Sequence, residues 1–137
     1  MYKLKYKKYK QKYLNLKGGV NEKEIIIVSN RKAGFFSCLL GIIQLAYKHI
    51  KNNKVPYILW QNPKYMEDND DNIFDYFFIQ SNKPKNYDIV YEKGMNTDEI
   101  LKIALENNLS FREQMNKMYN LICKLKPEFE EEINNFV

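Results

Sequence analysis

The pattern of apolar residues between positions 25 and 60 constrains the fold of this chain more than any other feature. Ile25 to Val28 form a short continuous apolar run, as in the central strands of parallel sheets. Residues 35–51 then show the spacing of an amphipathic helix, and Val55 to Trp60 form a second apolar run. A strand, a long helix and a second strand predict a βαβ unit, in which the two strands are parallel and the crossover is right-handed.

The helix predicted over residues 35–51 has a broad apolar face, which indicates packing on a sheet. Its predicted buried residues are Leu39, Ile42, Ile43, Ala46 and Ile50, widened by Phe36, Leu40 and Tyr47. Its predicted solvent-facing residues are Ser37, Gln44, Lys48 and Lys51.

Further elements are predicted after residue 72. They are a short helix over 73–78, a third strand over 88–91, and helices over 99–106, 111–125 and from Pro127 onwards. Ser110 and Glu113 have the spacing of a capping box. The sequence therefore predicts a small Rossmann-like three-layer α/β domain over residues 20–137, with a short parallel sheet and C-terminal helices.

Residues 1–19 form a basic leader that ends at Gly18-Gly19. Tyrosines recur in it at helical spacing, and its lysines include Lys3, Lys5, Lys7, Lys8, Lys10 and Lys12. Like charges four residues apart weaken an isolated helix, so we predict a helical or partly disordered extension. Alternatively, the leader binds a partner helix, an anionic membrane surface or nucleic acid. The first 17 residues carry seven lysines and no acid, whereas the other 120 carry 15 basic and 17 acidic side chains.

The sequence lacks the motifs of several common classes of site. Two distant cysteines and one histidine do not suit a zinc site, and no metal or resident cofactor is expected. Glycine-rich dinucleotide or phosphate-loop motifs do not occur, nor does a Gly-x-Ser-x-Gly elbow. His49 is predicted to lie at a helix end. No signal peptide or membrane-spanning segment is recognisable in the sequence.

Polar residues follow both predicted strands, at the edge of the sheet where α/β proteins bind ligands. Arg31, Gly34 and Ser37 follow the first strand, and Trp60, Asn62 and Tyr65 follow the second. Amides, an arginine and aromatic rings suit a sugar or nucleotide-sugar, because hydroxyls and phosphates need directional donors and a sugar ring stacks on an aromatic face.

Three segments resemble the N-terminal half of fucosyltransferase-like glycosyltransferases of the α-1,6- and protein-O-fucosyltransferase type. They are Gly34-Phe35-Phe36-Ser37, the strand Val55 to Trp60, and the segment Asn72 to Phe78. The resemblance implies two Rossmann-like domains and transfer of a sugar from a GDP-sugar to a glycan or protein acceptor.

By this resemblance Arg31, Gly34 and Ser37 border the donor phosphates, while Trp60, Asn62 and Tyr65 border the acceptor. The resemblance assigns no catalytic residue. The donor-binding motif that opens the second domain would come just after Val137. We therefore expect a truncated enzyme, or one that needs a second domain or chain and is inactive alone.

The leader resembles the Lys/Tyr-rich tracts that begin many proteins of giant DNA viruses, which implies a location in the host cytoplasm or the virion. An alternative function follows from this likeness. The chain could be a non-catalytic viral binding or virion-associated protein that acts through its leader.

Deletion of residues 1–19 tests the leader directly. We expect the deletion to abolish salt-sensitive binding to anionic vesicles or nucleic acid and to leave the thermal unfolding transition nearly unchanged, because the lysines act at the surface. Vesicle co-sedimentation and calorimetry measure the two effects. Loss of folding would show instead that the leader packs on the domain.

Overall fold

The computed structural model describes residues 23–62, 66 and 71–136. Its elements, in chain order, are β1 (Glu24–Ser29), α2 (Phe35–Lys51), β2 (Tyr57–Trp60), α3 (Ile73–Phe77), β3 (Tyr87–Tyr91), α4 (Thr97–Glu106), α5 (Phe111–Ile122) and α6 (Pro127–Phe136). The predicted leader and Tyr65 lie outside the described residues.

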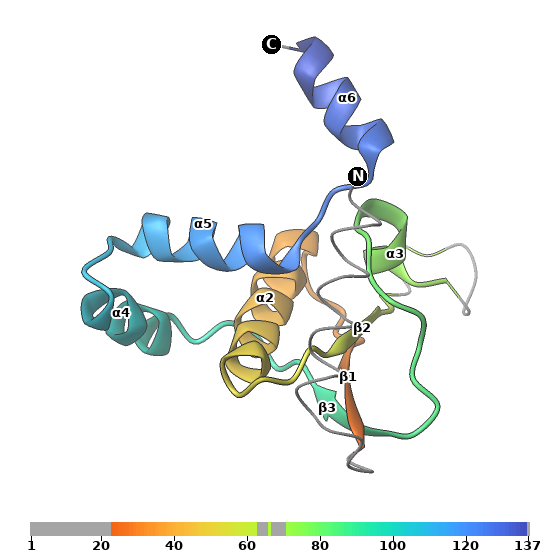
Figure 1. The fold of residues 1–137 in the computed structure, drawn as a ribbon, viewed down its shortest axis with the longest axis horizontal. Coiled ribbons are helices and arrows are strands. Elements are labelled where there is room, and N and C mark those ends of the chain that lie inside the picture. The colour runs from red at the N-terminus through yellow and green to blue at the C-terminus, as the bar shows by residue number, and fades with distance from the viewer. Residues whose placement is uncertain (1–22, 63–65, 67–70, 137) are drawn as a thin grey trace.

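The sheet has the order β2-β1-β3, and both strand pairs are parallel (Figure 1). Ile27, in the central strand, lies opposite Ile58 of β2 and Val90 of β3. The helix α2 connects the two parallel strands β1 and β2. The predicted α/β class, short parallel sheet and βαβ unit are therefore confirmed.

One face of the sheet is covered by α2, which in turn packs against α5. Ile25 and Ile27 of β1 meet Cys38, Ile42 and other buried residues of α2 in a single hydrophobic core. Since each fully buried aliphatic side chain contributes roughly 1.5–3 kcal/mol, this layer supplies much of the driving force for folding. Met118 and Ile122 of α5 extend the same core.

Two positions of α2 differ from the sequence-based prediction. Phe36 was predicted to be buried, but 71% of it is exposed. Phe35 instead faces inwards, with its ring 4.7 Å from that of Trp60. Gln44 was predicted to face solvent but is buried, because the segment before α4 packs on that side of the helix. Its amide exchanges two hydrogen bonds with the backbone of Asn96, of 3.1 and 2.7 Å.

The helices α4 and α5 begin with side-chain caps, from Asn96 and Ser110 respectively. Ser110 and Glu113 form the predicted capping box at the start of α5, and the hydrogen bonds to Ser110 lower the pKa of the Glu113 carboxyl.

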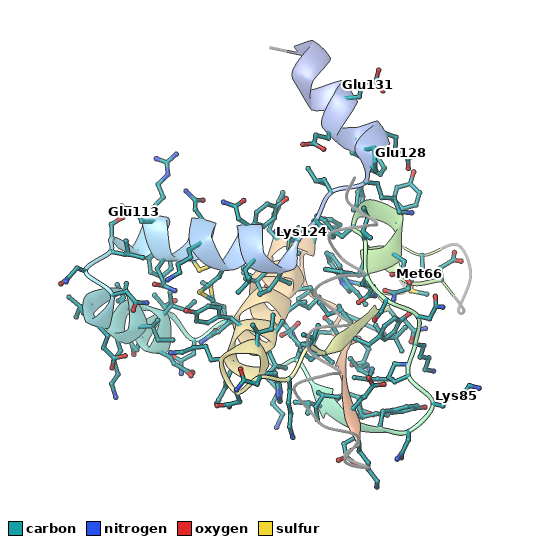
Figure 2. All side chains as sticks on the ribbon, viewed as in Figure 1. Met66, Lys85, Glu113, Lys124, Glu128 and Glu131 are labelled. Atoms are coloured by element: carbon teal, nitrogen blue, oxygen red, sulfur yellow. The ribbon has the colours of Figure 1, made fainter. Side chains whose placement is uncertain are left out.

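The helix α6 projects away from the α/β body, and Glu128 and Glu131 lie on this projecting part (Figure 2). None of the helices in the described part of the chain has the length and apolarity needed to cross a membrane.

The outer edge of β2 is closed by two side-chain amides rather than by a strand. The N–H of Ile58 donates to Gln80 Oε1 at 2.9 Å, and its carbonyl accepts from Gln80 Nε2 and Asn72 Nδ2, both at 2.7 Å. The N–H of Trp60 donates to Asn72 Oδ1 at 2.9 Å. Asn72 and Gln80 thus occupy the positions that a neighbouring strand would fill.

Substitution Gln80→Ala tests this closure. Loss of the amide leaves the N–H of Ile58 without its partner, so we expect the free energy of unfolding to fall by about 1–3 kcal/mol. Chemical denaturation measures the change. The matched control Asn82→Ala, at an exposed position nearby, should leave stability unchanged. Equal effects of the two substitutions would contradict the assignment.

Candidate functional site

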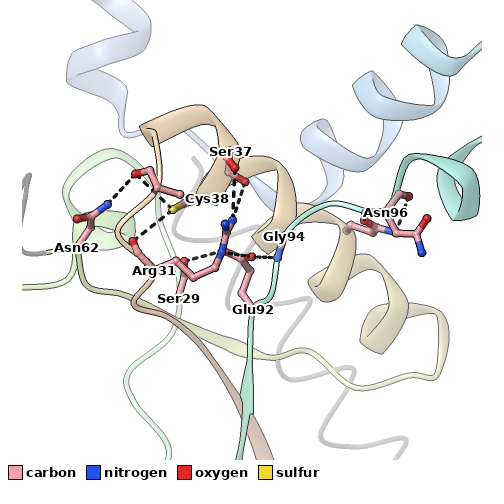
Figure 3. A network of polar contacts seen from close by, with 10 residues as sticks. Ser29, Arg31, Ser37, Cys38, Asn62, Glu92, Gly94 and Asn96 are labelled. Atoms are coloured by element: carbon pink, nitrogen blue, oxygen red, sulfur yellow. Dashed lines mark hydrogen bonds and ion pairs between the residues drawn. The ribbon is translucent and has the colours of Figure 1, made fainter.

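The candidate site lies at the carboxyl ends of the three strands, where polar residues of separate segments meet (Figure 3). Ser29 ends β1, Glu92 follows β3, and Asn62 lies two residues beyond β2. Parallel pairing brings these positions together although they are far apart in the sequence. The long helix α2 begins beside them.

At the centre is the carboxylate of Glu92, whose side chain is fully buried. It accepts hydrogen bonds from Ser29 Oγ at 2.9 Å, from Arg31 Nε at 2.9 Å and from the backbone N–H of Gly94. These four residues are called the Glu92 cluster below. A buried carboxylate is stable only when it is paired and its oxygens are satisfied, and both conditions hold here.

Arg31 connects the Glu92 cluster to the start of α2. Its Nη2 atom donates to the carbonyl of Ser37 at 3.3 Å and lies 3.5 Å from the Ser37 hydroxyl. The structure therefore brings together Arg31 and Ser37, two of the three residues assigned by resemblance to the donor phosphates. The charge of Arg31 is already balanced by Glu92, so its principal role in this arrangement is to fix the loop.

Gly34, the third residue of that set, is the N-cap of α2. It is exposed, its φ of −60° is open to other residues, and no side chain caps the helix. The preceding loop is held from two sides. Asn62 Nδ2 donates to the carbonyl of Ala33 at 3.1 Å, and the Cys38 thiol lies 4.0 Å from the same oxygen.

The residues assigned by resemblance to the acceptor lie differently from the expected rim. Trp60 is fully buried on the α2 side of the sheet, and its Nε1 finds no hydrogen-bond partner among the described residues. Asn62 is also fully buried. Neither side chain is accessible to a ligand in this conformation, and Tyr65 lies outside the described residues.

An open groove of about 990 Å³ runs beside β2 and α3 instead. Tyr76 lines this groove and is 62% exposed. Tyr57 also lines it, and the partial burial of its phenol, together with the nearby charge of Asp75, raises the pKa of that phenol. The Tyr57 hydroxyl donates to Asp75 Oδ2 at 3.2 Å. Residues that line the groove include Phe35, Gln61, Met66, Asp71 and Lys83. Aromatic faces and hydrogen-bonding groups are thus combined along one surface.

Two important residues of the site were missed by the sequence-based analysis. Glu92 was not recognised, although an acid directly after a predicted strand was a usable signal. Gly41 was also overlooked. A Cβ at this position would lie 2.5 Å from Glu92 Oε2, so the helix approaches the buried carboxylate as closely as only glycine permits.

The remaining reactive groups lie elsewhere. His49 is in the last turn of α2, as predicted, and burial together with Lys54 and Lys48 lowers the pKa of its imidazole. Burial raises the pKa of the Cys123 thiol to about 12, which keeps it protonated at neutral pH. Among the described residues, no group of three or more histidine, cysteine or acidic side chains could hold a metal ion.

Comparisons with protein-family models, with curated proteins and with solved structures find no match to this chain.

Two glycine substitutions, one within α2 and one at its N-cap, separate the packing of α2 against Glu92 from a general effect of alanine on the helix. Gly41→Ala places a methyl group against a carboxylate that three donor groups hold in place. We therefore expect a loss of about 1–3 kcal/mol of unfolding free energy, although alanine favours a helix.

Gly34→Ala is the control, because a Cβ there would meet nothing within 4 Å. We expect it to change the unfolding free energy by less than about 1 kcal/mol. Thermal and urea unfolding of both variants measure the difference. An unchanged or raised stability of Gly41→Ala would contradict the close approach.

Proposed function

We propose that this chain is the N-terminal, acceptor-side half of a fucosyltransferase-type glycosyltransferase that uses a GDP-sugar and acts together with a second domain or chain. The resemblance of Gly34-Phe35-Phe36-Ser37, Val55 to Trp60 and Asn72 to Phe78 suggests this family. The parallel α/β fold, with polar loops at the carboxyl ends of its strands, is compatible with it.

The groove beside β2 is the observation that carries the proposal. A sugar ring would stack its C–H face on the exposed ring of Tyr76, and its hydroxyls would bond to Asp75 and Gln61. Lys83 and Asp71 line the same groove and add a donor and an acceptor. In this proposal the acceptor sugar contacts these residues rather than the buried side chains of Trp60 and Asn62.

The donor side of the proposed site is the start of α2. The helix N-terminus offers backbone N–H groups and the positive end of the helix dipole, both of which favour a phosphate. Arg31 contributes mainly by holding the loop between β1 and α2, because its guanidinium is already paired with Glu92. The partner domain would supply the opposite side of the cleft, and transfer requires donor and acceptor to be held together.

Calorimetry on the full chain tests both sides of the proposed site. We expect GDP and GDP-fucose to bind, and a panel of glycans to contain acceptors that bind in the groove. Tyr76→Ala should weaken glycan binding by about tenfold, a loss of roughly 1.4 kcal/mol, and leave GDP binding unchanged.

Leu105→Ala, at an exposed position on α4, is the matched control and should change neither affinity. If the chain binds no GDP-sugar and no glycan of the panel, the proposal is wrong. Equal weakening of glycan binding by Tyr76→Ala and Leu105→Ala would place the acceptor outside the groove.

A further inference from the structure

The two outer edges of the sheet differ in a way that bears on association. At the β2 edge, the amides of Asn72 and Gln80 take up the outward-facing groups of Ile58 and Trp60. A further strand cannot pair there without displacing these four hydrogen bonds. Any extension of the sheet must therefore occur at the opposite edge, which is β3.

The outward-facing groups of β3 follow from its bonds to β1. The N–H of Glu92 donates to Val28 O at 2.8 Å, and Asn86 O accepts from Glu24 N at 3.1 Å, so the even-numbered residues of this segment face β1. The N–H and carbonyl groups of Tyr87, Ile89 and Tyr91 consequently point outwards. No bond from these groups to another residue is present within the described ranges.

The side chains of the same residues form an exposed apolar surface. Ile89 is 47% exposed and Tyr91 is 53% exposed, and they lie in register with the buried Ile26 and Val28 of β1. All these side chains lie on the face of the sheet that α2 does not cover, because successive residues of a strand alternate between faces. Lysine, proline and bulges, which commonly protect free edges, are absent from the outward positions of β3.

We infer that β3 is a dimerisation edge, at which it pairs antiparallel with β3 of a second copy about a two-fold axis at Ile89. This register places Ile89 opposite Ile89 of the second copy and Tyr87 opposite its Tyr91. Like residue types meet on the apolar face, where aromatic and β-branched cross-strand pairs are favourable. The outcome is one continuous six-stranded sheet.

Within β3 itself the charges agree with a second copy as the occupant, and the like charges of this register, Lys85 and Lys93, lie beyond the ends of the strand. Asp88, the one charged residue of the strand, lies opposite Val90 of the second copy and meets no like charge directly across. The leader of the same chain is a poorer occupant of this edge. Its apolar residues recur every three or four positions, which is a helical spacing and not that of a strand.

The closed β2 edge explains why such pairing would stop at two copies. A two-fold contact uses the same surface on both chains, and the outermost strands of the resulting sheet are both β2. Because Asn72 and Gln80 occupy these edges, the dimer has no free strand at which a third copy could add.

Sedimentation equilibrium and light scattering on the full chain, from micromolar to near-millimolar concentration, measure the association. We expect a reversible dimer with twice the 16.5 kDa mass of one chain. Hydrogen exchange at Tyr87, Ile89 and Tyr91 should slow as the concentration rises. A monomer over the whole range, or dimerisation without slower exchange at these amides, would overturn the proposal.

Charge substitutions at the proposed axis test the register. Ile89→Lys and Ile89→Glu each place two like charges opposite one another, so each variant alone should be monomeric. A mixture of the two should form a heterodimer, because lysine then faces glutamate. Leu105→Lys on α4, a more exposed position, should dimerise like the unmodified chain.

A heterodimer in the mixture would also show that both variants fold. Dimerisation of Ile89→Lys alone at the strength of the unmodified chain would overturn the proposed axis. If neither variant folds, the concentration dependence of hydrogen exchange in the unmodified chain decides between dimer and monomer.

Discussion

The buried carboxylate of Glu92 determines how the carboxyl ends of the strands and the start of α2 fit together. Ser29 Oγ, Arg31 Nε and the backbone N–H of Gly94 all donate to it, so one side chain joins β1, β3 and the segments that follow them. Removing a carboxylate from water costs several kcal/mol unless such donors surround it. The close approach of α2 at Gly41 completes this enclosure on the helix side.

The pairing of Arg31 with Glu92 limits the ability of the loop between β1 and α2 to bind an anion. An arginine with a free guanidinium would be a strong phosphate ligand, but Arg31 is paired with a buried acid and bonded to Ser37. The Arg31 side chain is therefore not free to bind an anion, whereas the neighbouring Lys32 of the same loop is exposed. In the proposed function, an anion would be bound mainly by the backbone at the start of α2, and a sugar by the groove beside Tyr76.

Those parts of the fold that depend on local sequence patterns were predictable. The continuous apolar run from Ile25 to Val28 identified the central strand, and the spacing of Ser110 and Glu113 identified the capping box. Phe36 was misplaced because Phe35, and not Phe36, packs against Trp60, and Gln44 was misplaced because it bonds to Asn96. Both Trp60 and Asn96 are distant in the sequence.

The candidate site was predictable only in part, for the same reason. Arg31 and Ser37 lie close together along the chain, and the structure brings them into contact. The direction of Trp60 could not be read from β2, because Tyr57 to Trp60 has apolar or aromatic residues at all four positions and so gives no alternation. Glu92 and Gly41 meet only through the pairing of β3 with β1 and the packing of α2.

The strand order β2-β1-β3 also sets the sequence in which the domain can assemble during synthesis. Of the three described strands, the central one is made first, and its β3 side stays unpaired with β3 until that strand has emerged. Ser29 and Glu92, which meet across that pair, are separated by 63 positions. Closing so long a loop is slow compared with forming α2 or the pair β1–β2. We therefore expect the hydrogen bond between Ser29 and Glu92 to form later than α2 and the pair β1–β2, so that it marks the completed three-stranded sheet.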